Sequence, residues 1–255
     1  MIKAIFFDVD GTLLWNEKNI VPESARRSLR RLQEKGIQCV VATGRHKQIL
    51  KLLPVGDIDF DGYILLTGQL CFDKAGNVLG GNPLKGKAKE LVVQMFRDKT
   101  IPLMLLEEDR WYINFVNDAV RTAHKAVVTP VPDVGEYDGG EIYQAIAYVS
   151  TKDTLVGLEE DCKLTRWNGQ AVDIISKEGG KVSGIQTYLK STGIRLEETM
   201  AFGDGENDVD MLEFAGLSVC MGNGAPEAKA VADYVTDSVG EDGIEKALIH
   251  FSLLD

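Results

Sequence analysis

The sequence predicts an α/β protein with a parallel sheet, helices on both of its faces and a smaller inserted α/β domain. Two observations carry this prediction. Short apolar runs alternate with amphipathic stretches, which is typical of strands joined by crossover helices. The same alternation returns near the C-terminus after a middle stretch in which helix-like and strand-like runs follow a different order. This indicates one core interrupted by an insertion.

The elements of the core follow from apolar spacing. Residues 2–7 are rich in Ile and Phe and are predicted as a β-strand, and residues 37–42 are predicted as a second buried strand. Residues 22–35 lie between them and are predicted as a helix, because their apolar side chains recur every three or four positions and a glycine follows. The C-terminal half of the core is predicted as strands at 199–202 and 217–221 and helices at 182–190, 225–232 and 244–251.

The middle of the chain is predicted to be a separate domain. A Gly-Gly-Asn-Pro linker at residues 80–83 precedes a helical run to Arg97. Strand-like runs then follow at 103–106, 111–116, 143–149 and 171–175. We therefore expect a core made of residues 1–81 and 180–255, with an inserted domain at 82–179.

Composition excludes several classes of protein. The 255 residues suit one large or two modest domains, and the net charge of −11 disfavours nucleic acid and membrane surfaces as partners. The four cysteines are widely spaced, without zinc-site spacing, and no signal or membrane-spanning segment stands out. We expect a cytoplasmic protein with free thiols that is a monomer or a weak homodimer.

Polar clusters at predicted strand ends are the candidate site, because ligands of open α/β sheets bind at the carboxyl edge. The first is Asp8-Val9-Asp10-Gly11-Thr12. Alternation in extended chain lets Asp8 and Asp10 point the same way, which suits a hard divalent cation or a nucleophile beside a general acid/base. A plain Asp-Gly turn is the alternative, whereas an EF-hand is disfavoured because its glycine and glutamate positions do not match.

Three further clusters are weaker when each is taken alone. Thr43-Gly44-Arg45 offers a hydroxyl and backbone amides to an anion, but it also suits an ordinary strand-to-helix turn. Lys181 begins a predicted helix after two glycines and, taken alone, resembles a solvated surface lysine. Gly203-Asp204-Gly205-Glu206-Asn207-Asp208 crowds three acids into one loop, which favours a bound cation.

Rival motifs lack essential parts. Residues 81–87 have P-loop spacing, but Ala88 replaces the hydroxyl residue that would hold magnesium and Pro83 removes a backbone amide. The three histidines are too scattered to support a metalloprotease or serine-triad site.

Taken together and in order, the four clusters resemble those of the haloacid dehalogenase-like phosphatases, specifically the Cof-type sugar-phosphate phosphatases. The resemblance spans residues 8–212 and implies a Rossmann-like core with an α/β cap inserted between the second and third motifs. It implies Asp8 as the nucleophile that forms a phosphoaspartate and Asp10 as general acid/base. It further implies Mg²⁺ held by Asp8, the Asp10 backbone carbonyl, Asp204 and Asp208.

The resemblance also implies which groups hold the substrate. The phosphoryl oxygens would be bound by Thr43, the Gly44 amide, Lys181 and Asn207. The cap would contact the leaving group, with Trp111, Arg166 and Trp167 as candidates. Relatives often carry Asn-Gly after the third core strand, and this chain instead has Thr67-Gly68-Gln69, which leaves that leaving-group contact open.

We therefore expect a phosphoric monoester hydrolase that uses Mg²⁺ and acts on small phosphorylated metabolites, first of all hexose phosphates. The alternatives that stay open are a phosphomannomutase-like phosphotransferase, a pyridoxal or flavin phosphate phosphatase, and a regulatory module that binds a phosphometabolite without turnover.

Overall fold

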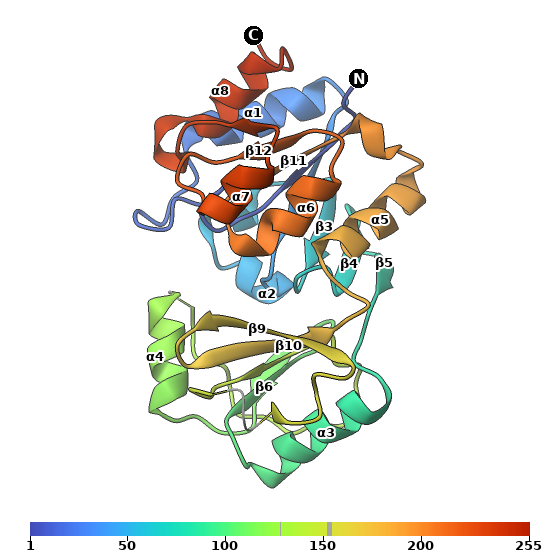
Figure 1. The fold of residues 1–255 in the computed structure, drawn as a ribbon, viewed down its shortest axis with the longest axis vertical. Helices are drawn as coiled ribbons and strands as arrows, with labels where there is room; N and C mark the ends of the chain where they lie inside the picture. Colours follow the sequence, from blue (N-terminus) through green and yellow to red (C-terminus); the bar gives the residue numbers. More distant parts are fainter. Residues whose placement is uncertain (128, 152–154) are drawn as a thin grey trace. The chain divides into compact units, whose positions relative to one another are not determined.

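The structure is a computed structural model that describes residues 1–127, 129–151 and 155–255. It divides into two compact units, Met1–Gly80 with Gly180–Asp255, and Gly81–Gly179. In Figure 1 the first unit runs from blue to cyan and from orange to red, and the second is green to yellow. That the second unit serves as a cap domain over residues 82–179 stays a prediction.

The first unit is built on a sheet that is parallel over most of its width, which confirms the predicted fold class. The strand order in the described residues is β13-β12-β11-β1-β2-β3-β4-β5, and every neighbouring pair from β13 to β3 is parallel, whereas β3 and β4 are antiparallel. The strands are β1 (Ala4–Phe7), β2 (Gln38–Ala42), β3 (Gly62–Leu65), β4 (Leu70–Asp73), β5 (Val78–Gly81), β11 (Thr199–Gly203), β12 (Ser218–Cys220) and β13 (Tyr234–Val235).

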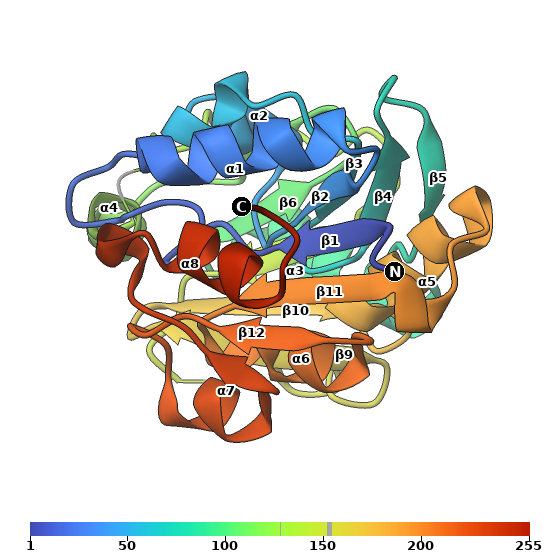
Figure 2. The same cartoon turned by 90° about the horizontal axis from the view of Figure 1, so that it is seen from above.

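Helices cover both faces of this sheet, as Figure 2 shows for α1 on one side and α6 and α7 on the other. Alternate strand residues such as Phe6 and Val40 pack against Ile185 and Leu212 in one buried cluster. The helices are α1 (Glu23–Glu34), α2 (Lys47–Leu50), α5 (Lys181–Thr192), α6 (Val209–Phe214), α7 (Pro226–Val231) and α8 (Gly243–His250). Short 3₁₀ turns are η1 (Pro54–Asp57), η3 (Leu196–Glu198), η4 (Glu206–Asp208) and η5 (Val239–Glu241).

The first helix illustrates how the sequence pattern produces these elements. Ala25, Leu29 and Leu32 are buried on one side of α1, as their helical spacing requires. Pro22 stands just before the helix rather than within its first turn. Gly36 follows the helix with φ +78°, a left-handed conformation that glycine adopts without steric cost.

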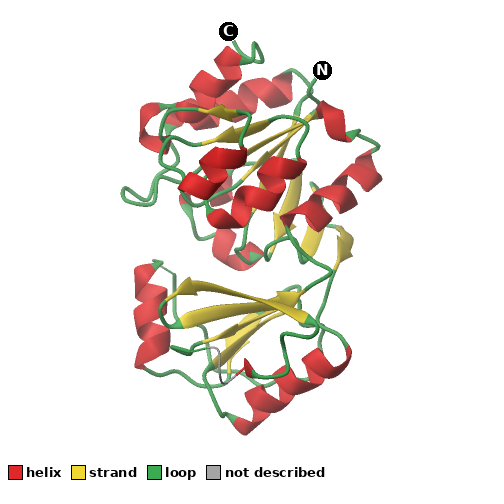
Figure 3. Ribbon diagram, in the orientation of Figure 1, coloured by secondary structure: helices red, strands yellow, loops and turns green. Residues whose placement is uncertain are grey.

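The second unit holds an antiparallel sheet in the order β7-β6-β8-β10-β9, shown in yellow in Figure 3. Its strands are β6 (Leu103–Leu106), β7 (Trp111–Ile113), β8 (Gln144–Ala147), β9 (Cys162–Asn168) and β10 (Ala171–Ser176), and its helices are α3 (Gly86–Asp98) and α4 (Asp118–Ala126). Val92 and Phe96 of α3 pack on one face of the sheet, against Leu103, Leu105 and Val172.

Two details of the strands differ from the sequence prediction. The glycines expected in a linker, Gly80 and Gly81, lie in strand β5. Strand β9 was not predicted, because lysine, threonine, arginine and asparagine interrupt its apolar pattern.

The cysteines and the helix lengths of the described residues bear on two sequence predictions, free thiols and the lack of a membrane-spanning segment. All four cysteines are free and buried. No helix in residues 1–127, 129–151 or 155–255 is both long enough and apolar enough to cross a membrane.

Candidate active site

Asp8 lies at the carboxyl edge of the sheet, directly after β1. Its backbone N–H donates to the Phe202 carbonyl of β11 at 2.9 Å, so the sheet hydrogen bonding continues through it. The chain then turns at Gly11, whose φ is +89°. A side chain at that position would also run into the Asp204 carboxylate. Glycine at position 11 therefore lets the turn pass close beside a second acid of the candidate site.

Lys181 connects two of the predicted acids. Its ammonium donates to Asp8 Oδ1 and Asp208 Oδ1, each at 2.5 Å, and all three side chains are almost fully buried. The alternative interpretation of Lys181 as a solvated surface lysine is therefore wrong. The reason is that Lys181 is the first residue of α5, and the start of this helix lies against the edge of the sheet where Asp8 follows β1.

Burial and charge perturb both members of the Asp8 and Lys181 pair. Burial, and secondarily the charge of Asp208, raise the pKa of Asp8 well above its ordinary value, although Lys181 acts in the opposite direction. For Lys181, burial favours the neutral amine, but the charges of Asp208 and Asp8 raise its pKa overall. The lysine is therefore a permanent cation among these acids.

Asp204 and Asp208 hold the fourth cluster in place. Asp204 Oδ1 accepts a hydrogen bond from Thr12 Oγ1 at 2.8 Å, which ties the fourth cluster to the first. Asp208 Oδ2 accepts the backbone N–H groups of Asp204 and Gly205 at 2.9 Å each. Burial, together with the charge of Asp208, raises the pKa of Asp204 to about 6.

Three of the predicted carboxylates are close enough to share a cation. One oxygen from each of Asp8, Asp204 and Asp208 lies within 4.8 Å of the other two. Carboxylate oxygens are the ligands that Mg²⁺ prefers in proteins, so the donor set fits that ion. The Asp10 carboxylate is not part of this group among the described residues.

Asp10 is instead held by Arg45. Arg45 Nε and Nη2 donate to the two oxygens of Asp10 at 2.7 Å each. This is a bidentate ion pair that is mostly shielded from solvent. Arg45 belongs to the second cluster, but its position in the sequence predicted no role for it. Its proximity to Asp10 follows from the adjacency of β1 and β2, which polar residues after two neighbouring strands could have suggested.

The predicted phosphate ligands lie at the same sheet edge to different degrees. Thr43 follows β2, is buried, and its hydroxyl accepts the Arg45 backbone N–H at 3.2 Å. Gly44 packs near the Thr67 hydroxyl, which would lie 3.2 Å from a Cβ added at Gly44. Asn207 is exposed in η4, and within the described residues no hydrogen bond ties it to Asp8 or Lys181.

The turn after β3 is strained and buried beside this edge. Leu66, Thr67 and Gly68 all have positive φ, at 53°, 55° and 79°, which is unusual for two non-glycine residues in succession. The turn packs against the backbone of Gly180, so a Cβ at Gly68 would strike that carbonyl. Gln69 is fully buried, and both of its amide atoms are without a hydrogen-bond partner in the described structure.

The three candidate cap residues have different surroundings within the second unit. Trp111 stacks on His124 with ring centroids 6.3 Å apart. The Arg166 guanidinium donates to the carbonyls of Val149, Asn168 and Gly169. Trp167 donates from Nε1 to Asp173 Oδ1 at 2.8 Å, and about a third of the residue, 36%, is exposed.

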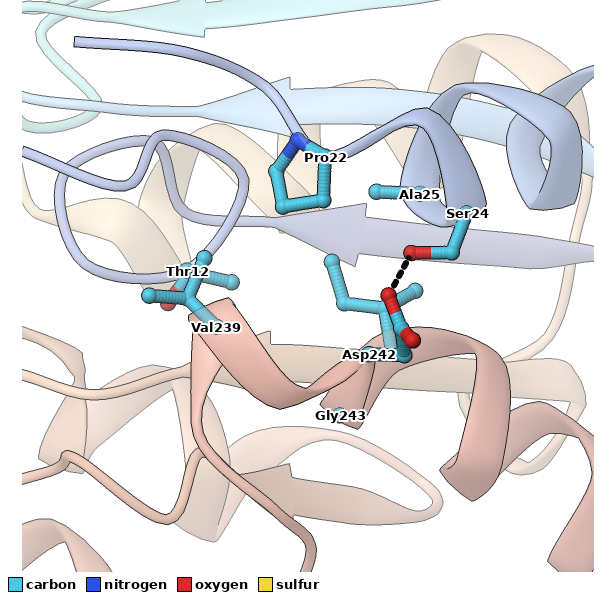
Figure 4. A pocket seen from close by; sticks show the side chains of 8 residues that line it. Thr12, Pro22, Ser24, Ala25, Val239, Asp242 and Gly243 are labelled. Atoms are coloured by element: carbon cyan, nitrogen blue, oxygen red, sulfur yellow. Dashed lines mark hydrogen bonds between the residues drawn. The ribbon is translucent and has the colours of Figure 1, made fainter. Parts of the chain in front are cut away.

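A hollow that Thr12 helps to line does not form a second site. It is lined by residues of the first cluster, α1, η5 and the start of α8, and Figure 4 shows Ser24 donating to Asp242 across it. It has no room for a water molecule, so we do not treat it as a ligand site.

Known proteins share this fold and part of this sequence. Residues 5–248 match the haloacid dehalogenase-like hydrolase family. The chain is 31% identical to YkrA of Bacillus subtilis (strain 168), over 99% of this chain and 98% of that protein. It is 27% identical to the pyridoxal phosphate phosphatase YbhA of Escherichia coli (strain K12), over 94% of this chain and 96% of that protein. The solved structure of the subclass IIB sugar phosphatase BT4131 has a TM-score of 0.85 and 32% identity over 99% of this chain and 100% of that chain.

Proposed function

This chain belongs to the haloacid dehalogenase-like hydrolase family and is a phosphatase of small phosphorylated metabolites, and we propose that it hydrolyses hexose phosphates through a phosphoaspartate on Asp8. The observation that carries the proposal is the buried cluster in which Lys181 holds Asp8 and Asp208, with Asp204 close by. A carboxylate fixed at a strand end by a buried cation is suited to attack a phosphorus atom, because its orientation is set before the substrate arrives.

The charge of the cluster calls for a divalent cation. Three carboxylates against one ammonium repel a phosphate dianion when all of them are ionised. Asp8, the Asp10 backbone carbonyl, Asp204 and Asp208 would hold Mg²⁺. When bound, the ion would screen these charges and polarise a phosphoryl oxygen.

Asp8 and Asp10 then divide the reaction into two displacements. Asp8 attacks phosphorus, the bond to the sugar oxygen breaks, and Asp10 gives its proton to that oxygen. In the second step Asp10 takes a proton from water, whose oxygen attacks phosphorus, and the bond to Asp8 breaks to release inorganic phosphate. Arg45 would orient Asp10 for these transfers, because its two-pronged contact fixes the plane of the carboxylate.

Four groups around Asp8 would hold the phosphoryl oxygens. The Thr43 hydroxyl, the Gly44 backbone amide and the Asn207 side-chain amide are neutral donors, and the Lys181 ammonium supplies the charge. Donors placed around the equatorial oxygens stabilise the transition state most, because charge accumulates on those oxygens as the phosphoryl group transfers.

The substrate class is the finer part of the proposal. Likeness to a sugar phosphatase supports hexose phosphates, whereas likeness to a pyridoxal phosphate phosphatase supports that alternative. A phosphomannomutase-like phosphotransferase would share Asp8 and Asp10 but would return the phosphoryl group to a sugar. A module that only binds phosphometabolites would need no acid/base partner beside its nucleophile.

Phosphate release from a substrate panel tests the proposal. The panel contains glucose 1-phosphate, glucose 6-phosphate, mannose 6-phosphate, pyridoxal phosphate and flavin mononucleotide, each with Mg²⁺ and with a chelator. We expect Mg²⁺-dependent release that is fastest with a hexose phosphate. Conversion of glucose 1-phosphate to glucose 6-phosphate without free phosphate would instead establish the mutase, and binding without turnover of any substrate would establish the regulatory module.

A further inference from the structure

The loop between β12 and α7, residues 221–225, lies beside the candidate active site. β12 is the parallel neighbour of β11, as Figure 2 shows, so the loops that follow these two strands leave the sheet at the same edge. The Ala225 N–H donates to the Asp204 carbonyl at 2.7 Å. A Cβ added at Gly224 would lie 3.1 Å from that carbonyl oxygen. The backbone of this loop therefore packs directly on Asp204, one of the proposed metal ligands.

Asn223 in this loop joins three segments of the first unit. Its Nδ2 group donates to the Gly11 carbonyl at 2.8 Å and to Asp204 Oδ2 at 3.4 Å. Its Oδ1 accepts the N–H of Val239, the first residue of η5, at 2.8 Å. A carbonyl only accepts and a backbone N–H only donates, so these two partners fix the orientation of the amide. The chemistry proposed above gives this side chain no task.

The Asp204 carboxylate is held from two sides by neutral donors. Thr12 Oγ1 donates to Oδ1 at 2.8 Å, and Asn223 Nδ2 donates to Oδ2 at 3.4 Å. Each carboxylate oxygen can accept more than one contact, so both donors leave capacity for a cation. The two contacts together restrict rotation of the carboxylate. Asn223 therefore orients this acid without adding charge to the cluster.

The contact with Gly11 bears on the proposed main-chain ligand, the Asp10 carbonyl. That carbonyl and the Gly11 N–H belong to one planar peptide group, and the N–H donates to the Leu14 carbonyl at 3.0 Å. The next peptide group is held at the Gly11 carbonyl by Asn223. Hydrogen bonds therefore fix both peptide groups around Gly11. Asn223 thereby limits the directions in which the Asp10 carbonyl can point.

We propose that Asn223 is a positioning residue for Mg²⁺, because it holds Asp204 and the Gly11 turn in place to receive the ion. This inference rests on the proposed function, since it concerns the ion of that reaction. Asn223 acts through Asp204 and Gly11, so its loss should weaken Mg²⁺ binding and leave phosphoryl transfer nearly intact once the ion is bound. An asparagine that only stabilised the loop would affect stability and leave Mg²⁺ affinity unchanged.

The test measures Mg²⁺ binding to the full chain without substrate. Bound Mg²⁺ stabilises the folded state, so the urea midpoint rises with Mg²⁺ concentration, and the concentration at which the rise begins reports the dissociation constant. In Asn223→Ala we expect this concentration to increase by about tenfold or more, as is typical when a group that orients a metal ligand is removed. Asn223→Ser should give the same shift, because its hydroxyl is one bond shorter than the amide nitrogen, and it replaces the alanine variant if that protein does not fold.

Kinetics separate positioning of the ion from damage to the reaction. The half-saturating Mg²⁺ concentration for phosphate release should increase in Asn223→Ala by the same factor as the dissociation constant. At saturating Mg²⁺, kcat should change by less than about threefold, because the variant removes a binding contribution and no interaction specific to the transition state.

Asn77→Ala is the matched control. Asn77 Nδ2 also donates to an aspartate carboxylate, Asp73 Oδ2, at 2.8 Å in an exposed turn. β4 is antiparallel to β3, which is parallel to β2 and through it to β1, so Asp73 lies at the opposite edge of the sheet from Asp8. This variant should keep the wild-type Mg²⁺ affinity.

The possible failures are distinguishable. Equal Mg²⁺ affinity of the wild-type protein and Asn223→Ala, or an equal shift in Asn77→Ala, would overturn the inference. If the wild-type protein releases no phosphate from any substrate, the proposed function fails, and the urea midpoints alone decide the role of Asn223. The absence of any Mg²⁺-dependent rise in the wild-type protein would overturn that role, since there would be no ion for Asn223 to position.

Discussion

Arg45 binds both carboxylate oxygens of Asp10 at 2.7 Å, while Asp8, two residues earlier, is held by Lys181. The two acids of the first cluster therefore have separate cations and separate surroundings. Asp8 is buried with Asp208, whereas about a third of the Asp10 side chain is exposed. Different environments allow two nearby carboxylates to take different roles, which agrees with the assignment of Asp8 as nucleophile and Asp10 as acid/base.

Removal of the Arg45 side chain should impair catalysis more than metal binding. In Arg45→Ala we expect kcat for a hexose phosphate to fall by roughly 10 to 100 times, because Asp10 loses the contact that orients it. Arg45→Lys should recover only part of this loss, because a lysine cannot make the two-pronged contact. Steady-state kinetics and Mg²⁺ titration measure both effects. Arg30→Ala is the exposed control, and an unchanged kcat in Arg45→Ala would show that Arg45 has no positioning role.

Loss of the Lys181 charge should destabilise the metal-free protein. Lys181→Met leaves Asp8 and Asp208 buried without their cation, which typically costs about 3–5 kcal/mol when one partner of a buried pair is removed. Urea denaturation in a chelator measures the change, and phosphate release should fall by about 100 times or more. Lys190→Met, on the exposed side of the same helix, serves as the control. Equal stability of the Lys181 and Lys190 variants would be inconsistent with the buried contacts.

Asp204 should make the metal-free protein less stable at higher pH. Burial raises its pKa to about 6, above the unfolded value near 3.9, so the folded state binds the proton more tightly. The resulting cost is fully present above about pH 6 and disappears as pH falls toward 4. This cost lowers the free energy of unfolding by roughly 2 kcal/mol. Contact of Asp204 with solvent keeps it below the value for a fully buried group.

The matched variant isolates this effect. In a chelator, Asp204→Asn should be more stable than wild type at pH 7, and the difference should shrink by pH 4.5, as followed by urea denaturation. Glu213→Gln, at an exposed position of α6, should show no such trend. A stability difference that does not depend on pH would contradict the raised pKa.

Replacement of the Gln69 amide should stabilise the fold. Both amide atoms are buried without partners, and an apolar side chain of similar size would remove that unsatisfied polar group. We therefore expect Gln69→Leu to raise the free energy of unfolding by about 1 kcal/mol, with Gln186→Leu on the surface as comparison. A loss of stability would mean that water hydrogen-bonds the amide in solution.

The sequence was informative where local pattern determines structure. The strand runs around residues 2–7 and 37–42 and the four clusters that follow strands could be predicted, because burial and strand-end chemistry leave a local signature. The contacts of Lys181 could not be predicted in the same way. Its partner Asp8 lies 173 residues away, and only the packing of α5 against the sheet brings the two together.

The missed features have similar physical causes. The Arg45 contact with Asp10 depends on a side-chain conformation that no spacing specifies. Strand β9 carries alternating polar residues whose register includes a bulge at Trp167, so apolar periodicity was too weak to identify it. The Asn168-Gly169 pair at the end of β9 was the available signal, because it is typical of hairpin turns.

We propose that Asp8 carries the phosphoryl group during the reaction. The most direct measurement is mass spectrometry of acid-quenched protein after brief reaction with a hexose phosphate and Mg²⁺. We expect a phosphorylated peptide that contains Asp8 in the wild-type protein, and neither this adduct nor phosphate release in a folded Asp8→Asn variant. Full phosphate release by Asp8→Asn, or a phosphoryl group found on another residue, would contradict it.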